Sequence, residues 1–468
     1  MNAEYHRLKD QARQCWEELE SVAETGTVKS PIDAAGCEEQ LVEMGIRLAS
    51  LAFGMVLVRS VADRQSKDRD QKFIKALPKK FHSQGKRSVS VSLRADVKVS
   101  LSVRYFHRLK DPSRSRRKNK RRGLYPTLLR LGIHGGWTPA TTARMVKSAA
   151  LLGSYQEAAV MLEAEGLKVS VNRLREVVAG TGNLLRKLER SGSLCPAGSV
   201  AGKRVVVTTD GGRVRIREKR RGKTKKGRKR FEAAWREPRL IMIYVVDEEG
   251  RQSADFRPII DGSMGSCDEL FALLLAYLEG LEITQAERVQ FVADGAAWIW
   301  KRVPKLIAAL GLKDEQVQQL IDYWHAVEYL GKLAESSSLD KPRRKQWVTT
   351  QKKRLLRGEI GSVVSAIDQL VGRKPTKDQT TWLNYFITHG IEQRRMDYST
   401  AKTHSMPIGS GAIESAIRRI INLRVKGNAI YWLRGNAETM IRLRAWIKAG
   451  RGEELFAQTT CVTPQLAL

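Results

Sequence analysis

The two stretches that decide the fold are residues 204–212, which read RVVVTTDGG, and residues 288–296, which read RVQFVADGA. Each is a continuous apolar run ending in Asp-Gly, a pattern typical of a strand buried on both faces of a sheet. Adjacent parallel strands would end at one sheet edge, where α/β proteins place their sites. We therefore expect Asp210 and Asp294 to lie in one cluster, although either Asp-Gly alone also fits an ordinary turn.

Two clustered carboxylates repel each other unless a cation lies between them. Mg²⁺ prefers oxygen ligands, and two Mg²⁺ ions roughly 3.5 to 4 Å apart can activate the attacking oxygen and stabilise the leaving oxygen of a phosphodiester. We expect two Mg²⁺ ions, replaceable by Mn²⁺, held by Asp210, Asp294 and a third acid. Residues 406–424, MPIGSGAIESAIRRIINLR, offer Glu414. Its simpler interpretation is a surface glutamate paired with Arg418.

Composition narrows the partner and the kind of metal site. The chain has 83 Lys+Arg against 50 Asp+Glu, a net charge of +33, which indicates a polyanionic partner, nucleic acid first. We find no apolar run near the roughly 18 to 20 residues that span a bilayer, and the charged start is no signal peptide, so we expect a soluble intracellular protein without a membrane partner. The five cysteines form no CxxC pair and the histidines no HxxxH, so any metal should be bound by oxygen.

Periodicity and charge divide the chain into segments. Residues 1–78 have helical periodicity, residues 89–105 alternate as a β-hairpin does, and residues 108–122 hold nine Lys/Arg and one acid. We predict a helical arm over 1–78, a β-hairpin and basic loop over 79–122, a helical domain over 123–195, an α/β core over 200–300 and 405–447, a helical insertion over 301–404 and a tail over 448–468.

Three short helices are predicted within residues 123–195. They open at Thr138-Pro139, at Ser154 with Glu157 completing a capping box, and after Ser170. In a helix-turn-helix the third would present Arg173 and Arg175, with Asn172, to the major groove. A helical packing domain fits these residues equally well.

Further basic residues are candidates for phosphate contact. They lie in the basic loop and in residues 213–230, which hold twelve Lys/Arg and one Glu: Arg116, Arg117, Lys225, Lys226 and Arg228. Such contacts would make DNA affinity fall steeply with salt. A charged face that serves only solubility is the alternative.

Five ordered segments carry a resemblance to a known family: TTDGGRVRIRE, AAWREPRLIMIYV, FVADGAAWIW, IDYWHAVEYL and IGSGAIESAIRRIINLRVKGNAIYWLRGNAETMIRLRAW. Together they resemble bacterial insertion-sequence DDE transposases of the Kra-type, within the wider Mutator-like group. The resemblance covers residues 204–447, roughly half the chain. It implies an RNase H-like core and a metal-dependent triad at Asp210, Asp294 and Glu414.

The same resemblance implies further roles and partners. The D-x-x-H of that group matches Asp322 and His325, whose family role is to support the active site or position DNA; alone, His325 would be a structural histidine. Members of the group often have a cysteine-rich knuckle after the early hairpin, and its absence here leads us to predict no zinc. Double-stranded DNA, both terminal inverted repeats and target, a homo-oligomer on DNA and a cytoplasmic, nucleoid-associated location in bacteria are the expected setting.

The function implied is DNA transposition by cleavage at element ends and 3′-OH strand transfer. Two alternatives stay open. One is an RNase H-like nuclease that never joins strands. The other is a domesticated DNA-binding protein with an inactive core, whose DNA binding would be indifferent to loss of the three acids.

Overall fold

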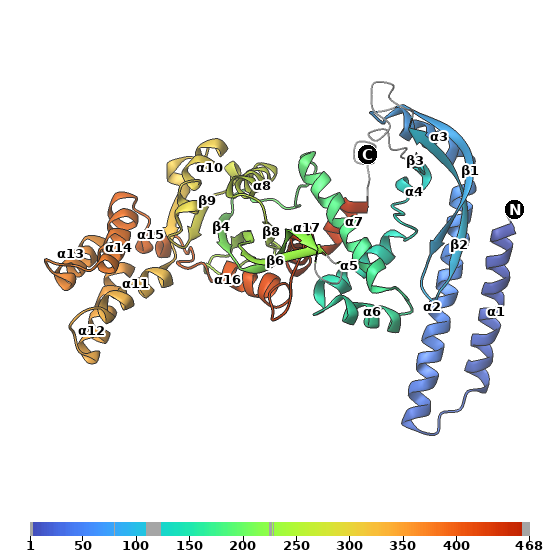
Figure 1. The fold of residues 1–468 in the computed structure, drawn as a ribbon, viewed down its shortest axis with the longest axis horizontal. Helices are drawn as coiled ribbons and strands as arrows, with labels where there is room; N and C mark the ends of the chain where they lie inside the picture. Colours follow the sequence, from blue (N-terminus) through green and yellow to red (C-terminus); the bar gives the residue numbers. More distant parts are fainter. Residues whose placement is uncertain (1–2, 79, 109–122, 224–226, 228, 461–468) are drawn as a thin grey trace. The chain divides into compact units, whose positions relative to one another are not determined.

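The computed structural model describes residues 3–78, 80–108, 123–223, 227 and 229–460 (Figure 1). The chain forms two compact units, Met1–Ser191 with Leu455–Leu468, and Gly192–Glu454. Each is described by itself.

The first unit is helical around one small sheet. Its strands are β1 (Phe81–Ser92), β2 (Lys98–Arg108) and β3 (Gly123–Leu124), in that order. Its helices are α1 (Ala3–Thr25), α2 (Pro31–Ala62), α3 (Arg64–Lys75), α4 (Pro126–Arg130), α5 (Pro139–Leu151), α6 (Tyr155–Ala164) and α7 (Val171–Arg190). The antiparallel β1–β2 pair is the expected hairpin, and the start of the chain is the expected helical arm.

Helix α2 is apolar over much of its length. Its second half buries Leu51, Leu57 and Val58 in a core shared with Val99 and Leu101 of β2. By length and composition alone, α2 could cross a membrane. This corrects the expectation that the chain has no such segment, although a buried core helix meets the same criteria.

Helices α5, α6 and α7 begin where the sequence predicts. Thr138, Ser154 and Ser170 are their N-caps, and each side chain accepts from the backbone amide three residues on. One detail differs from the prediction. The Glu157 carboxylate accepts from the amide of Gly153 at 3.0 Å, one residue before the cap, so the expected reciprocal box is displaced by one position.

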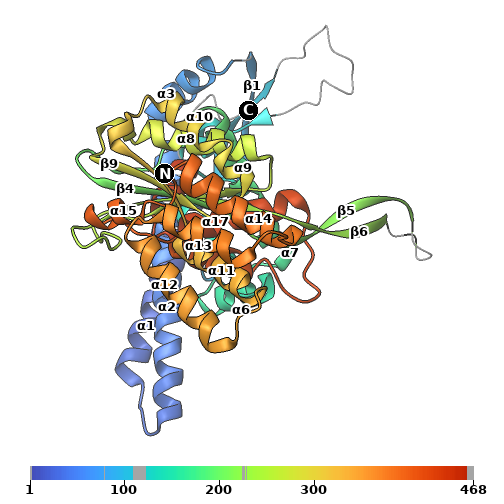
Figure 2. The same cartoon turned by 90° about the vertical axis from the view of Figure 1, so that its left-hand side faces the viewer.

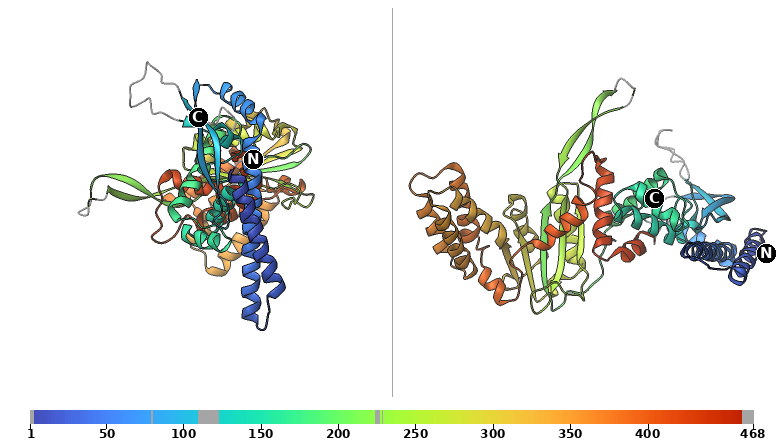
Figure 3. Two further views of the ribbon diagram at one scale, coloured as in Figure 1. Left: turned by 90° about the vertical axis from the view of Figure 1, so that its right-hand side faces the viewer. Right: turned by 90° about the horizontal axis from the view of Figure 1, so that it is seen from below.

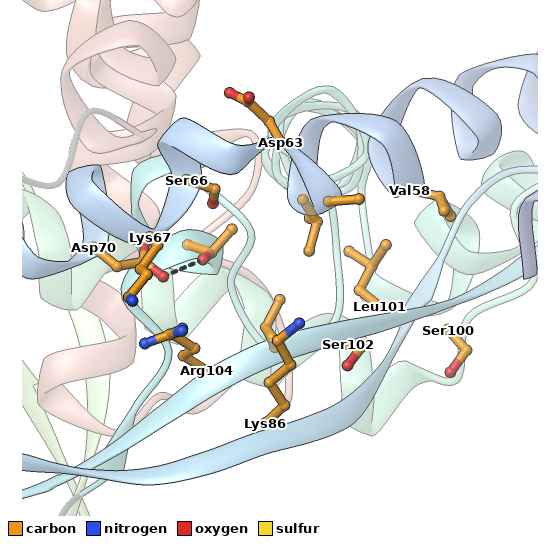
Figure 4. A pocket seen from close by; sticks show the side chains of 14 residues that line it. Val58, Asp63, Ser66, Lys67, Asp70, Lys86, Ser100, Leu101, Ser102 and Arg104 are labelled. Atoms are coloured by element: carbon orange, nitrogen blue, oxygen red, sulfur yellow. Dashed lines mark hydrogen bonds between the residues drawn. The ribbon is translucent and has the colours of Figure 1, made fainter. Parts of the chain in front are cut away.

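A cavity of about 440 Å³ lies between α2, α3 and β2 (Figure 4). Lys67, Lys86 and Arg104 are among its lining residues. At its wall, Asp70 is 2% exposed and accepts from the Thr127 hydroxyl at 2.7 Å. All of the residues that line the cavity belong to the first unit.

The second unit is an α/β structure built on a five-stranded mixed sheet, in the order β10-β9-β4-β7-β8. Its strands are β4 (Arg204–Gly211), β7 (Arg239–Val246), β8 (Ile259–Ser263), β9 (Arg288–Ala293) and β10 (Val317–Ile321). β4 is parallel to β9 and β9 to β10, whereas β7 is antiparallel to β4 and to β8. The apolar runs of β4 and β7 are buried almost throughout, as predicted for strands covered on both faces.

Helices cover this sheet and extend beyond it. They are α8 (Cys267–Gly280), α9 (Ala297–Trp300), α10 (Val303–Leu310), α11 (Tyr323–Glu335), α12 (Lys341–Leu356), α13 (Ile360–Val371), α14 (Lys377–Phe386), α15 (Tyr398–Thr403), α16 (Gly411–Ile417) and α17 (Arg434–Lys448). α8 packs against β7 and β8, α16 against β4 and β7, and α17 against β8. Figure 1 shows α11 to α14 gathered together.

Between β4 and β7 the chain forms a separate two-stranded ribbon, β5 (Val214–Lys223) with β6 (Lys229–Arg236). Figures 2 and 3 show it extending away from the five-stranded sheet. Residues 224–226 and 228 at its tip lie outside the described residues.

Two short strands and one helix correct the sequence analysis. β8 and β10 were not expected, and β10 lies within residues 301–404, so the all-helical stretch begins only after Ile321. The two glutamines of VQQLI interrupt the apolar pattern typical of a buried strand, so β10 could not be predicted from it. Gln318 is nevertheless buried, and its side-chain oxygen accepts from the Gln290 side-chain amide of β9 at 3.2 Å. The predicted tail contains helix α18 (Gly452–Thr460).

A buried ion pair joins β8 to α17. Asp261 is fully buried, and its carboxylate accepts from the Arg442 guanidinium at 2.9 and 2.8 Å. The Tyr277 hydroxyl at 2.6 Å and the Trp446 ring nitrogen at 3.2 Å also donate to it. Each oxygen therefore has partners, and the charge is matched within the protein.

Candidate active site

Three aspartates follow three adjacent parallel strands at one edge of the sheet. In the β4–β9 ladder Thr208 is opposite Val292, so the residues two positions on are Asp210 and Asp294. In the β10–β9 ladder Ile321 is opposite Ala293, so the next residues are Asp322 and Asp294. The Asp322 amide donates to the Ala293 carbonyl at 2.8 Å, which continues the ladder by one bond. Strand register alone thus brings the three together.

Asp210 is half-buried at the end of β4, and its Oδ1 accepts from the Gly211 amide at 2.6 Å. Burial raises the pKa of Asp210 to about 6, and the negative charges of Asp294 and Glu414 contribute to this rise. The hydrogen bond from the Gly211 amide and the positive charge of His325 act in the opposite direction and lower the pKa. Because these charges act on one another, the carboxylates share one electrostatic environment. Asp210 and Asp294 are thus brought together, as the two Asp-Gly strand ends predicted.

Asp294 is held at the start of the turn that leads into α9. Its Oδ1 accepts from the Ala296 amide at 3.0 Å, and its carbonyl accepts from the Trp300 ring nitrogen at 2.5 Å. The neighbouring Gly295 has no room for a side chain, since a Cβ there would overlap the Tyr385 ring. Packing against Tyr385 therefore requires a glycine at this position.

Asp322 is fully buried and connects two parts of the site. It is the N-cap of α11, where its Oδ1 accepts from the His325 amide at 2.9 Å. Its Oδ2 accepts from the Ser410 hydroxyl at 2.7 Å and from the Ser410 amide. Burial favours the neutral acid, but the bonds from His325 and Ser410 outweigh it and hold the pKa of Asp322 well below its usual range.

These bonds position the loop that carries Glu414. Ser410 immediately precedes α16, and the Tyr323 amide donates to the Ile408 carbonyl at 2.9 Å. Gly409 lies against Asp322 and Trp324, so that a Cβ there would be 3.1 Å from the Trp324 ring. Glu414, in the first turn of α16, is exposed. The loop is thus fastened to the start of α11, and Glu414 is exposed near Asp210, whose pKa its charge helps to raise.

His325 contributes a positive charge to this group. Its Nδ1 lies 3.4 Å from Asp322 Oδ1. That pairing raises the pKa of His325 to about 9, against the opposing effect of burial, and Asp294 and Glu414 add to the rise. In the metal-free protein at neutral pH the imidazole is therefore cationic.

The donor set suits a hard divalent ion. Ligand atoms of Asp322, His325 and Glu414 all lie within 4.8 Å of one another, a set that overlaps the predicted ligands only at Glu414. Asp322 already accepts hydrogen bonds on both oxygens, which makes it a poor ligand. Asp210 and Asp294 each use one oxygen on a backbone amide, and their second oxygens have no hydrogen bond from the described part of the chain. Their mutual repulsion with Glu414 is what a divalent cation would relieve.

The predicted DNA-contacting residues fall into two groups. Arg173 is half-buried and bonds to Glu176 at 2.8 Å and to the Gly135 carbonyl, whereas Arg175 is exposed and lies over the Tyr155 ring at 5.6 Å. The remaining predicted residues lie outside the described residues: Arg116, Arg117, Lys225, Lys226 and Arg228.

Two residues at the site were not found from the sequence. Ser410 bonds to Asp322 across 88 positions, and nothing in GSG signals so distant a partner. Trp324 is 61% exposed between Asp322 and His325, and Lys352 lies 5.7 Å from its ring centroid. A large apolar side chain between two polar site residues was the available signal.

Comparisons with known proteins add little to this geometry. No family model matches the chain, and no curated protein matches it. Among solved structures, the chain is similar to one described as "Drosophila P element transposase strand transfer complex", at 10% identity and a TM-score of 0.25, over 69% of this chain and 82% of that chain. A TM-score of 0.25 is too low to establish a shared fold.

Proposed function

We propose that the chain is a DDE transposase, a metal-dependent polynucleotidyl transferase that cleaves DNA at the ends of an insertion sequence and joins the freed 3′-OH to target DNA. The proposal rests on the position of Asp210, Asp294 and Asp322 at the C-terminal ends of three adjacent parallel strands. The bond from Ser410 to Asp322 holds the loop before α16, the helix that carries Glu414, against these strand ends. The mixed sheet beneath this row supports an RNase H-like core.

Asp210, Asp294 and Glu414 would hold the metal. Two Mg²⁺ ions, or Mn²⁺ in their place, would lower the charge on the scissile phosphate and its attacking and leaving oxygens. The Asp210 carboxyl, whose pKa is near 6, is ionised at neutral pH and so available as a ligand. Glu414, exposed on a short helix, can adjust to an incoming ion.

Asp322 and His325 serve different purposes in this scheme. Asp322 is a positioning residue, because its oxygens are occupied by the backbone and side chain that set the Glu414 loop. His325 faces the acidic cluster and can donate to a phosphate oxygen. The exposed Trp324 ring lies where a base or sugar of a bound strand could pack.

Double-stranded DNA is the proposed partner, bound by a homo-oligomer in the cytoplasm of a bacterium. The net charge of +33 supports a polyanionic ligand. Proposed membership in the Kra-type, Mutator-like transposases rests on the ordered motifs of the sequence.

A strand-transfer assay tests the proposal. Duplexes containing the inverted repeats that flank the gene are incubated with the full chain in Mg²⁺, Mn²⁺ or EDTA, and both nicked and joined products are followed. We expect joined product with either metal, none in EDTA, and loss of product in Asp210→Asn, Asp294→Asn and Glu414→Gln.

Other outcomes select other functions. Metal-dependent nicking without joined product would indicate a nuclease. DNA binding without nicking, unchanged in all three variants, would indicate a DNA-binding protein with an inactive core and would overturn the proposal.

A further inference from the structure

The β5–β6 ribbon has two chemically different faces. From Val214 to Lys219 its residues pair in register with Arg236 to Phe231, and directly opposed residues share a face. One face carries Arg215 with Trp235, Arg217 with Ala233 and Lys219 with Phe231. The ribbon's two glutamates in this stretch, Glu218 and Glu232, lie on the other face, where Arg236 pairs with Glu218 at 2.5 Å. The first face is therefore cationic and aromatic without an acid among these pairs.

Side chains on the first face, together with Tyr431 from a third segment, form a row of guanidinium groups and aromatic rings in contact with one another. Arg215 lies 5.3 Å from the Trp235 ring centroid and 5.0 Å from that of Tyr431. The Tyr431 and Phe231 centroids are 6.2 Å apart, and Arg217 lies 4.3 Å from the Phe231 centroid. We name these five residues, Trp235, Arg215, Tyr431, Phe231 and Arg217, the Arg–aromatic ladder.

The ladder is held in place by backbone contacts from a third segment. The Arg217 amide donates to the Trp432 carbonyl at 2.7 Å, and the Trp432 amide donates to the Arg215 carbonyl at 3.1 Å. The Arg215 guanidinium donates to the Gly427 carbonyl at 2.6 Å. Val214 and Ile216, on the opposite face, are buried. Val214 and Ile216 thus pack into the protein, whereas on the ladder side Arg217, Phe231 and Trp235 are exposed and Arg215 and Tyr431 are half-buried.

The exposed aromatic rings of the ladder indicate a ligand-binding surface. Trp235 is 52% and Phe231 47% exposed, on an arm that extends from the rest of its unit (Figure 2). Duplex phosphates require cations only, and exposed rings add nothing to their binding. Unpaired bases, in contrast, stack on aromatic rings and on guanidinium planes while the same cations neutralise their phosphates.

Chain connectivity puts the ladder next to the carboxylates. Four residues separate Asp210 from Arg215. On the other side, α16, which carries Glu414, leads through the π-helical turn Arg418–Asn422 to the segment with Tyr431. Gly212 approaches Ile421 so closely that a Cβ would be 2.8 Å from it, which ties the two connections together.

We propose that the Arg–aromatic ladder binds unpaired bases of a DNA strand, such as the single-stranded end exposed beside the cleavage site. The inference rests on the proposed function, since it assumes a DNA substrate, and it adds that part of this substrate is held unpaired. The site belongs to this ribbon and is distinct from the metal-binding carboxylates.

Fluorescence anisotropy in EDTA tests binding apart from catalysis. The full chain is titrated with a single strand, a blunt duplex, and a duplex with an unpaired end that carries 2-aminopurine. Trp235→Ala and Phe231→Ala should weaken binding of the single strand and the unpaired end roughly tenfold or more. Trp235→Phe should retain most affinity, and 2-aminopurine emission should change on binding of the wild type and Trp235→Phe but much less with Trp235→Ala.

The matched control is Trp16→Ala, which removes a tryptophan that is 51% exposed in α1. It should leave affinity for all three DNAs within about twofold, and thermal unfolding checks that each variant is folded. Equal affinity of Trp235→Ala and the wild type for the unpaired end would overturn the proposal. An equal loss of blunt-duplex binding would also overturn it, because the ladder would then hold paired DNA.

Failure of the proposed function gives a different pattern. Absence of metal-dependent cleavage with the ladder effect intact would reject the transposase assignment and leave the ladder as a site for unpaired bases. Cleavage without a ladder effect would do the reverse.

Discussion

Two groups of acids on one sheet show what distinguishes a structural carboxylate from a functional one. Asp261 on β8 is fully buried and bonded to Arg442, Tyr277 and Trp446. At the ends of β4 and β9, Asp210 and Asp294 are only half-buried and repel each other and Glu414. The charge of Asp261 is neutralised by Arg442. The charges of Asp210, Asp294 and Glu414 would be neutralised by a bound divalent cation. The presence or absence of a cationic partner in the protein therefore distinguishes the structural acid from the proposed functional acids more clearly than burial does.

The largest expected effect concerns catalysis. Asp294→Asn should lower metal-dependent DNA cleavage by at least roughly four orders of magnitude, because a metal ligand worth several kcal/mol of transition-state stabilisation is lost. Single-turnover cleavage in Mg²⁺ measures it. Thermal unfolding in EDTA should show a variant as stable as the wild type, and a destabilised variant would place Asp294 with Asp261 among the structural acids.

The second prediction concerns the buried ion pair between Asp261 and Arg442. Arg442→Met removes the cation beside Asp261 and should lower the free energy of unfolding by about 3–5 kcal/mol, the usual result of leaving a buried charge unpaired. Urea unfolding at neutral pH measures this free energy. The double variant Asp261→Leu/Arg442→Met should recover part of the loss; if it recovers none, the ion pair is not the cause.

A smaller effect, on metal affinity, is expected at Ser410, which bonds to Asp322. Ser410→Ala removes the hydroxyl bond to Asp322 and loosens the Glu414 loop, so the affinity for metal should fall roughly 10-fold to 100-fold, as for other groups that orient metal ligands. The Mn²⁺ concentration that gives half-maximal cleavage measures it. Ser415→Ala, at an exposed position in α16, is the matched control, and an equal shift there would indicate general weakening of the helix.

The smallest effect is a pH dependence of the metal-free protein. The pKa of Asp210 is about 6 when folded, against its ordinary value of 3.8, so the folded state binds the proton more tightly than the unfolded state. Its contribution to stability therefore grows as the pH falls through 6 toward 4, by about 1 kcal/mol after allowance for solvent screening. Urea unfolding in EDTA at pH 7 and pH 5 tests this, with Asp210→Asn expected to lose the dependence.

The sequence by itself determined the central strands and the helix starts. Short apolar runs rich in Val and Ile and followed by turn residues are typical of strands buried on both faces, so β4, β7 and β9 could be predicted from local sequence. Thr138, Ser154 and Ser170 begin helices because a hydroxyl satisfies free amides at that position. The clustering of Asp210 with Asp294 followed from the same runs, since both aspartates end strands.

Tertiary structure decided the rest, because the deciding contacts are remote in sequence. β10 has two glutamines among its five residues; it forms a parallel ladder with β9, and its buried Gln318 accepts from the Gln290 side chain of that strand. The bond from Ser410 to Asp322 spans 88 positions and sets the place of Glu414, which from its own neighbours is an ordinary helical glutamate. Asp261 also stands before a glycine, after Ile259 and Ile260, and its burial against Arg442 identifies it as structural. Local pattern therefore predicted β4, β7, β9 and the capped helices, while long-range contacts decided the position of β10 and which acids face one another.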